Sequence, residues 1–290
     1  MKKKVEKALE LIREQAEKHD KPVVACSWGK DSLVVLHLVN RIIDDFDVLW
    51  NNTKVHYPSV YNVKDQLQDE WGLNIVEKQA KKSFWEIVDE YGFPGVNSSD
   101  RSDKANSACC YWIKKKPTKE AIKENNWDLY FDGLTAYESD RRWLNINDYG
   151  LAHYHKSFGL QKVHPIGFWT VDEVWDYIEK HDIPYPDVYD NEVESYEKRG
   201  YSEQQQGHRV DRAIRNGCWC CTLAVKSCPG KMEQLRTYYP KMWEHLMKSG
   251  LADKIAEKKL GGQGTLTDGY YTEETRDYWL DERPCFFDQS

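Results

Sequence analysis

Short apolar segments alternate with longer segments of helical periodicity along the first 190 residues. The apolar segments have the length of buried strands, and the longer segments carry apolar residues at helical spacing. Strands that alternate with helices form a parallel sheet with helices on both faces, so the pattern predicts an α/β fold. The predicted strands are residues 22–27, 47–52, 73–78, 127–133 and 162–168, and the main predicted helices are residues 32–43, 58–71, 83–91 and 170–181.

The pattern changes after about residue 190, which indicates a second part of the chain. The remaining residues contain no β-rich segment, but a polar, Tyr-rich stretch, a cluster of cysteines and a helical segment. We therefore predict an α/β domain over residues 1–190. Residues 191–290 form a small α-rich extension that carries cysteines.

Composition favours a soluble cytoplasmic protein without a membrane partner. Charged residues are 31% of the chain and no apolar run approaches the roughly 20 residues of a membrane span. The opening MKKK resembles the start of a signal peptide, but the polar segment VEKALELIREQAEKHDK follows, with helical spacing. In a reducing cytoplasm, clustered cysteines bind metal or do redox chemistry more often than they form disulfides.

The net charge of -7 argues against a protein that coats nucleic acid, because such binding comes from neutralising phosphates. A local basic surface remains open, either as a nucleic-acid contact or as an ordinary solvated face. Its candidates are 114–116, 141–142 and 258–259.

A loop with the composition of a phosphate site joins the first predicted strand to the first long helix. It reads SWGKDS, residues 27–32. Backbone N–H groups at a helix N-terminus attract anions, Gly29 allows close approach, and Lys30 adds a positive charge. Ser27 and Ser32 add hydroxyl groups. The loop lacks the G-x-x-x-x-G-K-[ST] pattern of kinases and GTPases, and its alternative interpretation is a strand-to-helix turn with a capping serine.

SWGKDS resembles the pyrophosphate loop of the ATP pyrophosphatase (PP-loop) superfamily, whose fold is adenine nucleotide alpha hydrolase-like, in the branch of the phosphoadenylyl-sulfate reductases. WNNTKVHYPSVY (50–61) and GLTAYESDRR (133–142) are similar to two further segments of that family. Thr135 stands where an arginine is usual. The resemblance implies nucleotide binding by Ser27, Trp28, Gly29, Lys30, Asp31, Ser32, Thr53, Gly133, Glu138 and Ser139.

Members with such a loop cleave ATP between the α and β phosphates and adenylylate an acceptor. The resemblance implies that Lys30 stabilises the departing pyrophosphate, that Asp31 orients the loop or holds Mg²⁺, and that Arg142 is a third catalytic residue. A protein that binds ATP without turnover is the non-enzymatic alternative.

Five of the eight cysteines fall in two groups, CC at 109–110 and CWCC at 218–221. Zinc and a redox-active Cys-x-x-Cys are alternatives, although structural zinc sites usually show two well-separated pairs. The combination resembles the [4Fe-4S] sites of adenylyl-sulfate reductases, and GCWCCT resembles a segment of the DndC- and SspD-type DNA phosphorothioation proteins. The implied cluster ligands are Cys109, Cys110, Cys218 and Cys221, with Cys220 and Cys228 in reserve, Cys285 undecided and Cys26 in the core.

These resemblances together imply an iron–sulfur ATP pyrophosphatase that releases AMP and pyrophosphate during sulfur insertion. The implied acceptor is the DNA backbone, and the implied sulfur donor is a cysteine desulfurase. A phosphoadenylyl-sulfate or adenylyl-sulfate reductase and a tRNA thiolase are the alternatives. The reductases carry a C-terminal ECGIH- or ECGLH-like segment, whereas this chain ends RPCFFDQS.

Overall fold

The computed structural model describes residues 1–94, 104–138, 140–191, 216–222 and 231–251, without the side chains of residues 106, 138 and 140. The chain divides into two compact units. Unit 1 comprises Met1–Ala80 and Lys114–Asp187, and unit 2 comprises Lys81–Ile113 and Val188–Ser290. Residues 81–113 precede the last strands of the sheet in sequence, yet they belong with the C-terminal part of the chain.

Unit 1 is built on a six-stranded sheet with the strand order β3-β2-β1-β4-β6-β5. All neighbouring strands are parallel except β5 and β6. The mostly parallel α/β fold predicted from the sequence is therefore confirmed. The strands are β1 Pro22–Ala25, β2 Asp47–Asn52, β3 Asn74–Gln79, β4 Leu129–Phe131, β5 Ala152–His155 and β6 Leu160–Val163.

The antiparallel hairpin of β5 and β6 differs from the sequence prediction. A strand was expected over 162–168, but β6 ends at Val163, and Pro165, which has no N–H to donate, follows closely. β5 was not predicted, because its sequence AHYH is short and polar and carries little of the apolar signal of a strand. The sheet thus ends in an edge strand of opposite direction.

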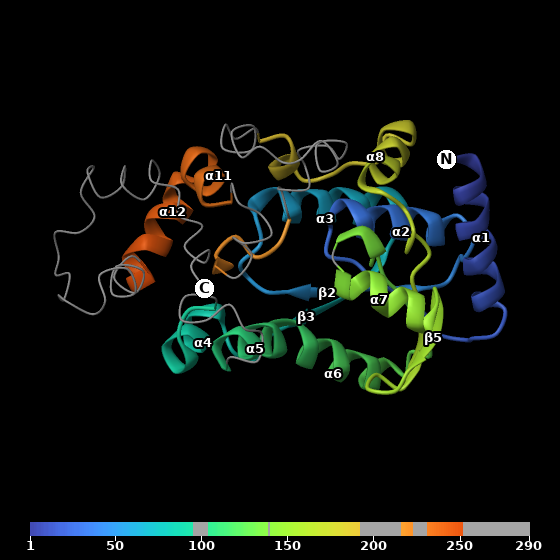
Figure 1. Cartoon of the computed structure of the whole chain (residues 1–290), viewed down its shortest axis with the longest axis horizontal. Coiled ribbons are helices and arrows are strands. Elements are labelled where there is room, and N and C mark those ends of the chain that lie inside the picture. Colours follow the sequence, from blue (N-terminus) through green and yellow to red (C-terminus); the bar gives the residue numbers. More distant parts are fainter. Residues whose placement is uncertain (95–103, 139, 192–215, 223–230, 252–290) are drawn as a thin grey trace. The chain divides into compact units, whose positions relative to one another are not determined.

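Helices cover both faces of this sheet, as expected. Figure 1 shows α2 and α3 on one side of the strands and α6 on the other. On the α6 side, Ala121 and Ile122 pack with Val23, Leu49 and Tyr130 from three strands in a core cluster. The helices of unit 1 are α1 Lys2–Ala16, α2 Lys30–Asn40, α3 Pro58–Trp71, α6 Lys116–Asn125, α7 Asp140–Tyr149 and α8 Val171–Lys180, with the short η2 Ala136–Glu138.

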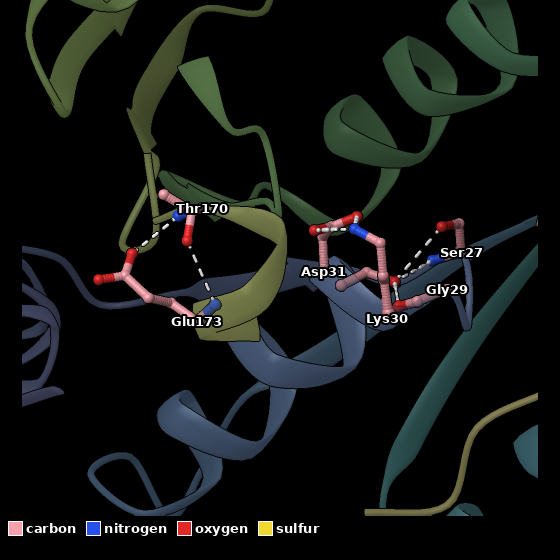
Figure 2. A network of polar contacts seen from close by, with 7 residues as sticks. Ser27, Gly29, Lys30, Asp31, Thr170 and Glu173 are labelled. Atoms are coloured by element: carbon pink, nitrogen blue, oxygen red, sulfur yellow. Dashed lines mark hydrogen bonds and ion pairs between the residues drawn. The ribbon is translucent and has the colours of Figure 1, made fainter. Parts of the chain in front are cut away.

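A capping box begins α8, the helix that the sequence predicted over residues 170–181. The Thr170 hydroxyl accepts a hydrogen bond from the Glu173 N–H at 3.3 Å, and the Glu173 carboxylate accepts one from the Thr170 N–H at 2.8 Å (Figure 2). Lys4 of α1 adds an ion pair of 2.6 Å to Glu173. These bonds satisfy backbone donors that the first turn of a helix leaves open.

The described part of unit 2 is mainly helical. Trp85 lies against Trp219 and His245, with ring centroids 6.2 and 4.8 Å apart, so the segment before residue 113 packs on the segments after residue 188. Thr222 donates to the Pro94 carbonyl, a second link of this kind. The helices are α4 Phe84–Tyr91, α5 Lys104–Cys110, α11 Lys231–Tyr238 and α12 Pro240–Leu246, with η6 Met247–Leu251; η1 Tyr111–Lys115 and η3 Asp187–Tyr189 cross the boundaries of the units.

No helix within the described ranges is long and apolar enough to cross a membrane.

Candidate functional site

The SWGKDS segment lies between β1 and α2, at the carboxyl end of a strand that has parallel neighbours on both sides. α2 begins at Lys30, and Gly29 precedes it in an extended conformation with φ -92° and ψ 160°. The first N–H groups of the helix therefore face the edge of the sheet where parallel α/β proteins bind ligands. The geometry is that of an anion-binding helix N-terminus.

Ser27 and Ser32 form hydrogen bonds within this loop. The Ser27 N–H donates to the Ser32 Oγ at 3.2 Å, and the Ser32 hydroxyl lies 2.9 Å from the Gly29 carbonyl, to which it donates. The hydroxyl groups of Ser27 and Ser32 are 3.3 Å apart. The serines, predicted as phosphate ligands, also hold the backbone of the loop in shape.

Trp28 takes the strained position of the loop. Its φ of 58° is left-handed, which is costly for a bulky residue, by about 1–3 kcal/mol. Its side chain is fully buried and meets Trp50, at the end of β2, edge-on at 6.4 Å. The positive φ thus falls on Trp28, whereas Gly29, predicted to allow close approach of the backbone, is extended.

Lys30 and Asp31 form an ion pair at the start of α2 (Figure 2). The Lys30 ammonium lies 2.8 and 2.9 Å from the two carboxylate oxygens of Asp31. Only 7% of the Lys30 side chain is exposed, and a charge at that depth requires a partner. Asp31 thus keeps a positive charge beside the helix N-terminus, while its contact with Mg²⁺ stays a prediction.

Gly133 packs directly on the SWGKDS loop, residues 27–32, which is the predicted phosphate loop. A Cβ at this position would lie 2.7 Å from the Asp31 carbonyl carbon and 2.8 Å from the Ser32 nitrogen. Backbone atoms cannot yield as a flexible side chain can, so the position requires glycine. The structure therefore brings one residue of the predicted 133–142 segment against the loop.

The other predicted nucleotide contacts of unit 1 are spread over neighbouring elements. Thr53 is buried in the loop after β2, and its hydroxyl accepts a hydrogen bond from the Val55 N–H at 3.4 Å. Arg142 lies half-buried in α7. Glu138 ends η2, and its side chain lies outside the described residues, as does Ser139. Their roles stay predictions.

Five of the ten buried polar atoms without a hydrogen-bond partner in the described residues lie in or after β1 and β2. Such atoms are rare in proteins, and each calls for a water, a ligand or a structural reason. Among them, His56 has its pKa lowered to about 4, chiefly because burial disfavours the charged ring. The atoms are Trp28 Nε1, Trp50 Nε1, Asn51 Oδ1, His56 Nδ1 and Ser59 Oγ.

A partly buried ionic cluster, which sequence reasoning missed, lies where β4 and β6 end. The Asp132 carboxylate is 2.8 Å from the Lys162 ammonium and 2.5 Å from the His164 Nδ1. Burial alone would raise the pKa of Asp132, but Lys162 and His164 hold that pKa well below its usual range. The available signal was an aspartate immediately before Gly133.

Cysteines from distant parts of the sequence come together in unit 2. Burial, followed by the nearby Cys218, Cys221 and Cys109, raises the pKa of the Cys220 thiol well above its ordinary value. The Cys221 N–H donates to the Cys218 carbonyl at 3.1 Å, which makes the second cysteine segment a tight turn. Of the adjacent pair 109–110, it is Cys109 that acts on Cys220.

These thiols suit an iron–sulfur cluster in kind and number, since such a cluster requires four thiolates. The described cysteines are thiols and none is in a disulfide. Within the described ranges, however, no three His, Cys, Asp or Glu side chains are arranged to hold a metal ion. The ligand set stays a prediction. Cys228 and Cys285 lie outside the described residues.

Cys26 is a core residue, as expected. Its side chain is buried at the end of β1, and burial raises the pKa of its thiol to about 12. A thiol of that kind stays protonated and is unsuited to metal binding.

A parallel sheet with an anion-binding loop at its carboxyl edge defines a nucleotide-binding α/β protein. The phosphoadenosine phosphosulfate reductase domain family matches residues 21–224, and the chain belongs to that family. The matched residues include the SWGKDS loop, all strands of the sheet and the described cysteines. The family is one of enzymes, which agrees with the reductase branch recognised in the sequence.

Two curated relatives illustrate the range of this similarity. The adenosine 5'-phosphosulfate reductase of Staphylococcus haemolyticus is 32% identical over 177 residues, which are 61% of this chain and 68% of that protein. An uncharacterized protein of Methanocaldococcus jannaschii is 28% identical over 268 residues, 91% of this chain but only 48% of that protein. The second similarity extends beyond the reductase-like region.

A solved structure supports the fold. The phosphoadenylyl-sulfate reductase of Candida auris, in a phosphate complex, superposes with a TM-score of 0.50 at 17% identity, covering 63% of this chain and 83% of that one. At this identity the likeness concerns the fold alone.

Proposed function

We propose that the chain is an iron–sulfur ATP pyrophosphatase that adenylylates an acceptor for sulfur transfer. The observation that carries the proposal is the phosphate loop with its buried Lys30–Asp31 pair at the N-terminus of α2. Sulfonucleotide reductases, whose nucleotide has already lost its pyrophosphate, typically lack such a loop. A complete loop is therefore better explained by a substrate that still carries pyrophosphate.

The reaction places negative charge where the loop can stabilise it. An oxygen of the acceptor attacks the α-phosphorus of ATP, the bond to the bridging oxygen of the β-phosphate breaks, and pyrophosphate leaves with both electrons of that bond. Lys30 and the first N–H groups of α2 stabilise this departing charge. Mg²⁺ would neutralise the phosphates of ATP, and Asp31 is the candidate residue to hold it.

Cysteines of unit 2 are the candidate holders of the [4Fe-4S] cluster. The proposed ligands are Cys109, Cys110, Cys218 and Cys221, and the burial of Cys109 and Cys218 favours a site shielded from water. A bound cluster would carry or hold sulfur supplied by a cysteine desulfurase. Unit 1 carries the residues proposed for ATP cleavage, and unit 2 carries the residues proposed to hold the cluster.

DNA is the proposed acceptor, and one surface of unit 1 supports it. Tyr137 and Trp143 are 39% and 41% exposed, with ring centroids 5.5 Å apart, and Arg141 is exposed beside them in sequence. Exposed aromatic rings stack on unpaired bases, and guanidinium groups bind phosphates. Tyr137 follows Gly133 by four residues in sequence.

Reduction of adenosine 5'-phosphosulfate is the second candidate. The name of the relative from Staphylococcus haemolyticus favours it. Sulfite formation from adenylyl sulfate or phosphoadenylyl sulfate with thioredoxin would select this function over ATP cleavage. A tRNA thiolase is distinguished from a DNA-modifying enzyme by the acceptor on which sulfur appears.

The test measures pyrophosphate release from ATP by anaerobically purified protein, with a DNA oligonucleotide and a sulfide source present. We expect release by the wild type and a loss of about 10²–10³-fold in kcat for Lys30→Met, in line with removal of one charge-stabilising donor. Lys18→Met is the matched control, because Lys18 is an exposed lysine paired with Glu14 on α1. No release by cluster-loaded wild type would refute the proposal.

Iron content provides a separate test of the cluster. The anaerobic protein should be brown, with absorbance near 400 nm, about four irons per chain and loss of iron in Cys218→Ser. Individual Ser substitutions of Cys109, Cys110 and Cys220 show which of them are ligands. A colourless, zinc-containing wild type would contradict the iron–sulfur assignment.

A further inference from the structure

The cluster of Asp132, Lys162 and His164 lies at the ends of two strands of unit 1. Asp132 follows β4 directly and precedes Gly133, while Lys162 and His164 belong to β6 and the turn after it. β4 is the parallel neighbour of β1, the strand that leads into the phosphate loop. The cluster therefore lies beside the loop at the carboxyl edge of the sheet.

Four contacts fix Asp132 to its surroundings. Besides the bonds to Lys162 and His164, its carboxylate accepts a hydrogen bond from the Leu134 N–H at 3.2 Å. Its own N–H donates to the Val163 carbonyl at 3.1 Å. The side chain of His164 is only 2% exposed, so bulk water cannot replace its contact with Asp132.

The residue that Asp132 fixes is the one that touches the phosphate loop. Gly133 has no room for a Cβ against the backbone of Asp31 and Ser32, at 2.7–2.8 Å. Any displacement of residues 132–134 is therefore passed to the first turn of α2 by contact between backbones. That turn carries Lys30 and the N–H groups that bind the phosphates of ATP in the proposed reaction.

We propose that Asp132 is a positioning residue, which ties the end of β6 to the Gly133 loop and thereby sets the phosphate loop against its substrate. The part of the inference that concerns turnover rests on the proposed ATP cleavage. The part that concerns the position of the loop does not, because it can be measured without substrate.

The variant Asp132→Asn keeps the size of the side chain and removes its charge, and Asp47→Asn is its matched control. Asp47 is also a half-buried carboxylate that joins elements, since it accepts hydrogen bonds from Trp127 Nε1 at 2.7 Å and Asn74 Nδ2 at 2.5 Å. It begins β2 and so lies at the opposite, amino end of the sheet. Both variants lose bonds to one carboxylate, but only Asp132 is near the loop.

The first measurement is hydrogen exchange of the peptide that covers residues 26–36. We expect exchange about tenfold faster in Asp132→Asn than in the wild type, as loss of bonds to a charged group implies, and unchanged exchange in Asp47→Asn. Lys162→Met, which leaves the His164 contact in place, should give a smaller change of the same sign and serves if Asp132→Asn folds poorly. Equal exchange in the two Asn variants would overturn the proposal.

The second measurement is pyrophosphate release. We expect kcat to fall about 10–100-fold in Asp132→Asn with KM for ATP within about threefold of the wild type, because misplacement of a charge-stabilising loop affects the transition state most. A fall in Asp47→Asn of the same size would contradict the positioning role. If the wild type releases no pyrophosphate, the proposed function fails, and the exchange comparison alone decides the inference.

Discussion

Replacement of Gly133 by alanine tests how closely two loops must fit. The new Cβ would lie 2.7 Å from the Asp31 carbonyl carbon, whereas ordinary contact begins at 3.4 Å, so the backbones must separate by about 0.7 Å. Overpacking of this kind destabilises a protein by about 1–3 kcal/mol. A displacement near 1 Å can cost about 10²-fold in rate. We expect Gly133→Ala to fold, but to release pyrophosphate about 10–100-fold more slowly.

Urea denaturation and initial rates of pyrophosphate release, on the same preparations, measure both effects. Gly72→Ala is the control: Gly72 has φ +62° at the end of α3, with nothing within 4 Å of its added Cβ. It should lose about 1 kcal/mol through backbone strain, but no activity. A Gly133→Ala variant with wild-type kcat would refute the close-fit argument, as would an equal loss of activity in Gly72→Ala.

Three further predictions concern the stability of unit 1, its dependence on pH, and the proposed binding of DNA. Thr170→Ala should lower the free energy of unfolding by about 0.5–2 kcal/mol, because the capping hydroxyl of α8 is lost, and urea denaturation measures this change. The pKa of His56 is lowered to about 4 by burial, so the unfolded chain binds more protons than the folded chain between pH 4 and 6.5. Stability should therefore fall by up to about 3 kcal/mol as the pH drops through that window, and His56→Gln should flatten the profile measured by denaturation at several pH values; an unchanged slope would contradict the buried neutral ring. Trp143→Ala should weaken binding of single-stranded DNA by about 1–3 kcal/mol in fluorescence anisotropy, whereas Tyr238→Ala, which removes an exposed aromatic ring of unit 2, should not.

Local sequence signals predicted those helices and strands of unit 1 that have a clear apolar pattern or clear boundary residues. The α3 helix begins at Pro58 and ends at Trp71 as expected, because proline at the first turn and Gly72 after the last are strong boundary signals. The strand β5 was missed because an edge strand need not be apolar. The loop between β1 and α2 was predicted because Ser27–Ser32 is a local motif, and phosphate binding there stays a prediction.

Contacts between distant residues could not be predicted in this way. The Asp132 cluster joins residues 30 positions apart in sequence, and no periodicity reports such a pairing. The left-handed conformation of Trp28 accompanies the burial of its ring against Trp50, which is a contact between distant residues. The grouping of residues 81–113 with the C-terminal part was missed because the chain leaves unit 1 and returns to it without a change in composition.

That grouping orders events during synthesis of the chain. Unit 1 is complete once residue 187 has been made, whereas Cys109 must wait for residues 218–221 before it can meet the other thiols. Unit 1 can therefore fold before the thiols assemble, and the proposed cluster would be loaded at a late step of maturation. In cells starved of iron, the chain should then have a folded unit 1 and lack only the proposed cluster.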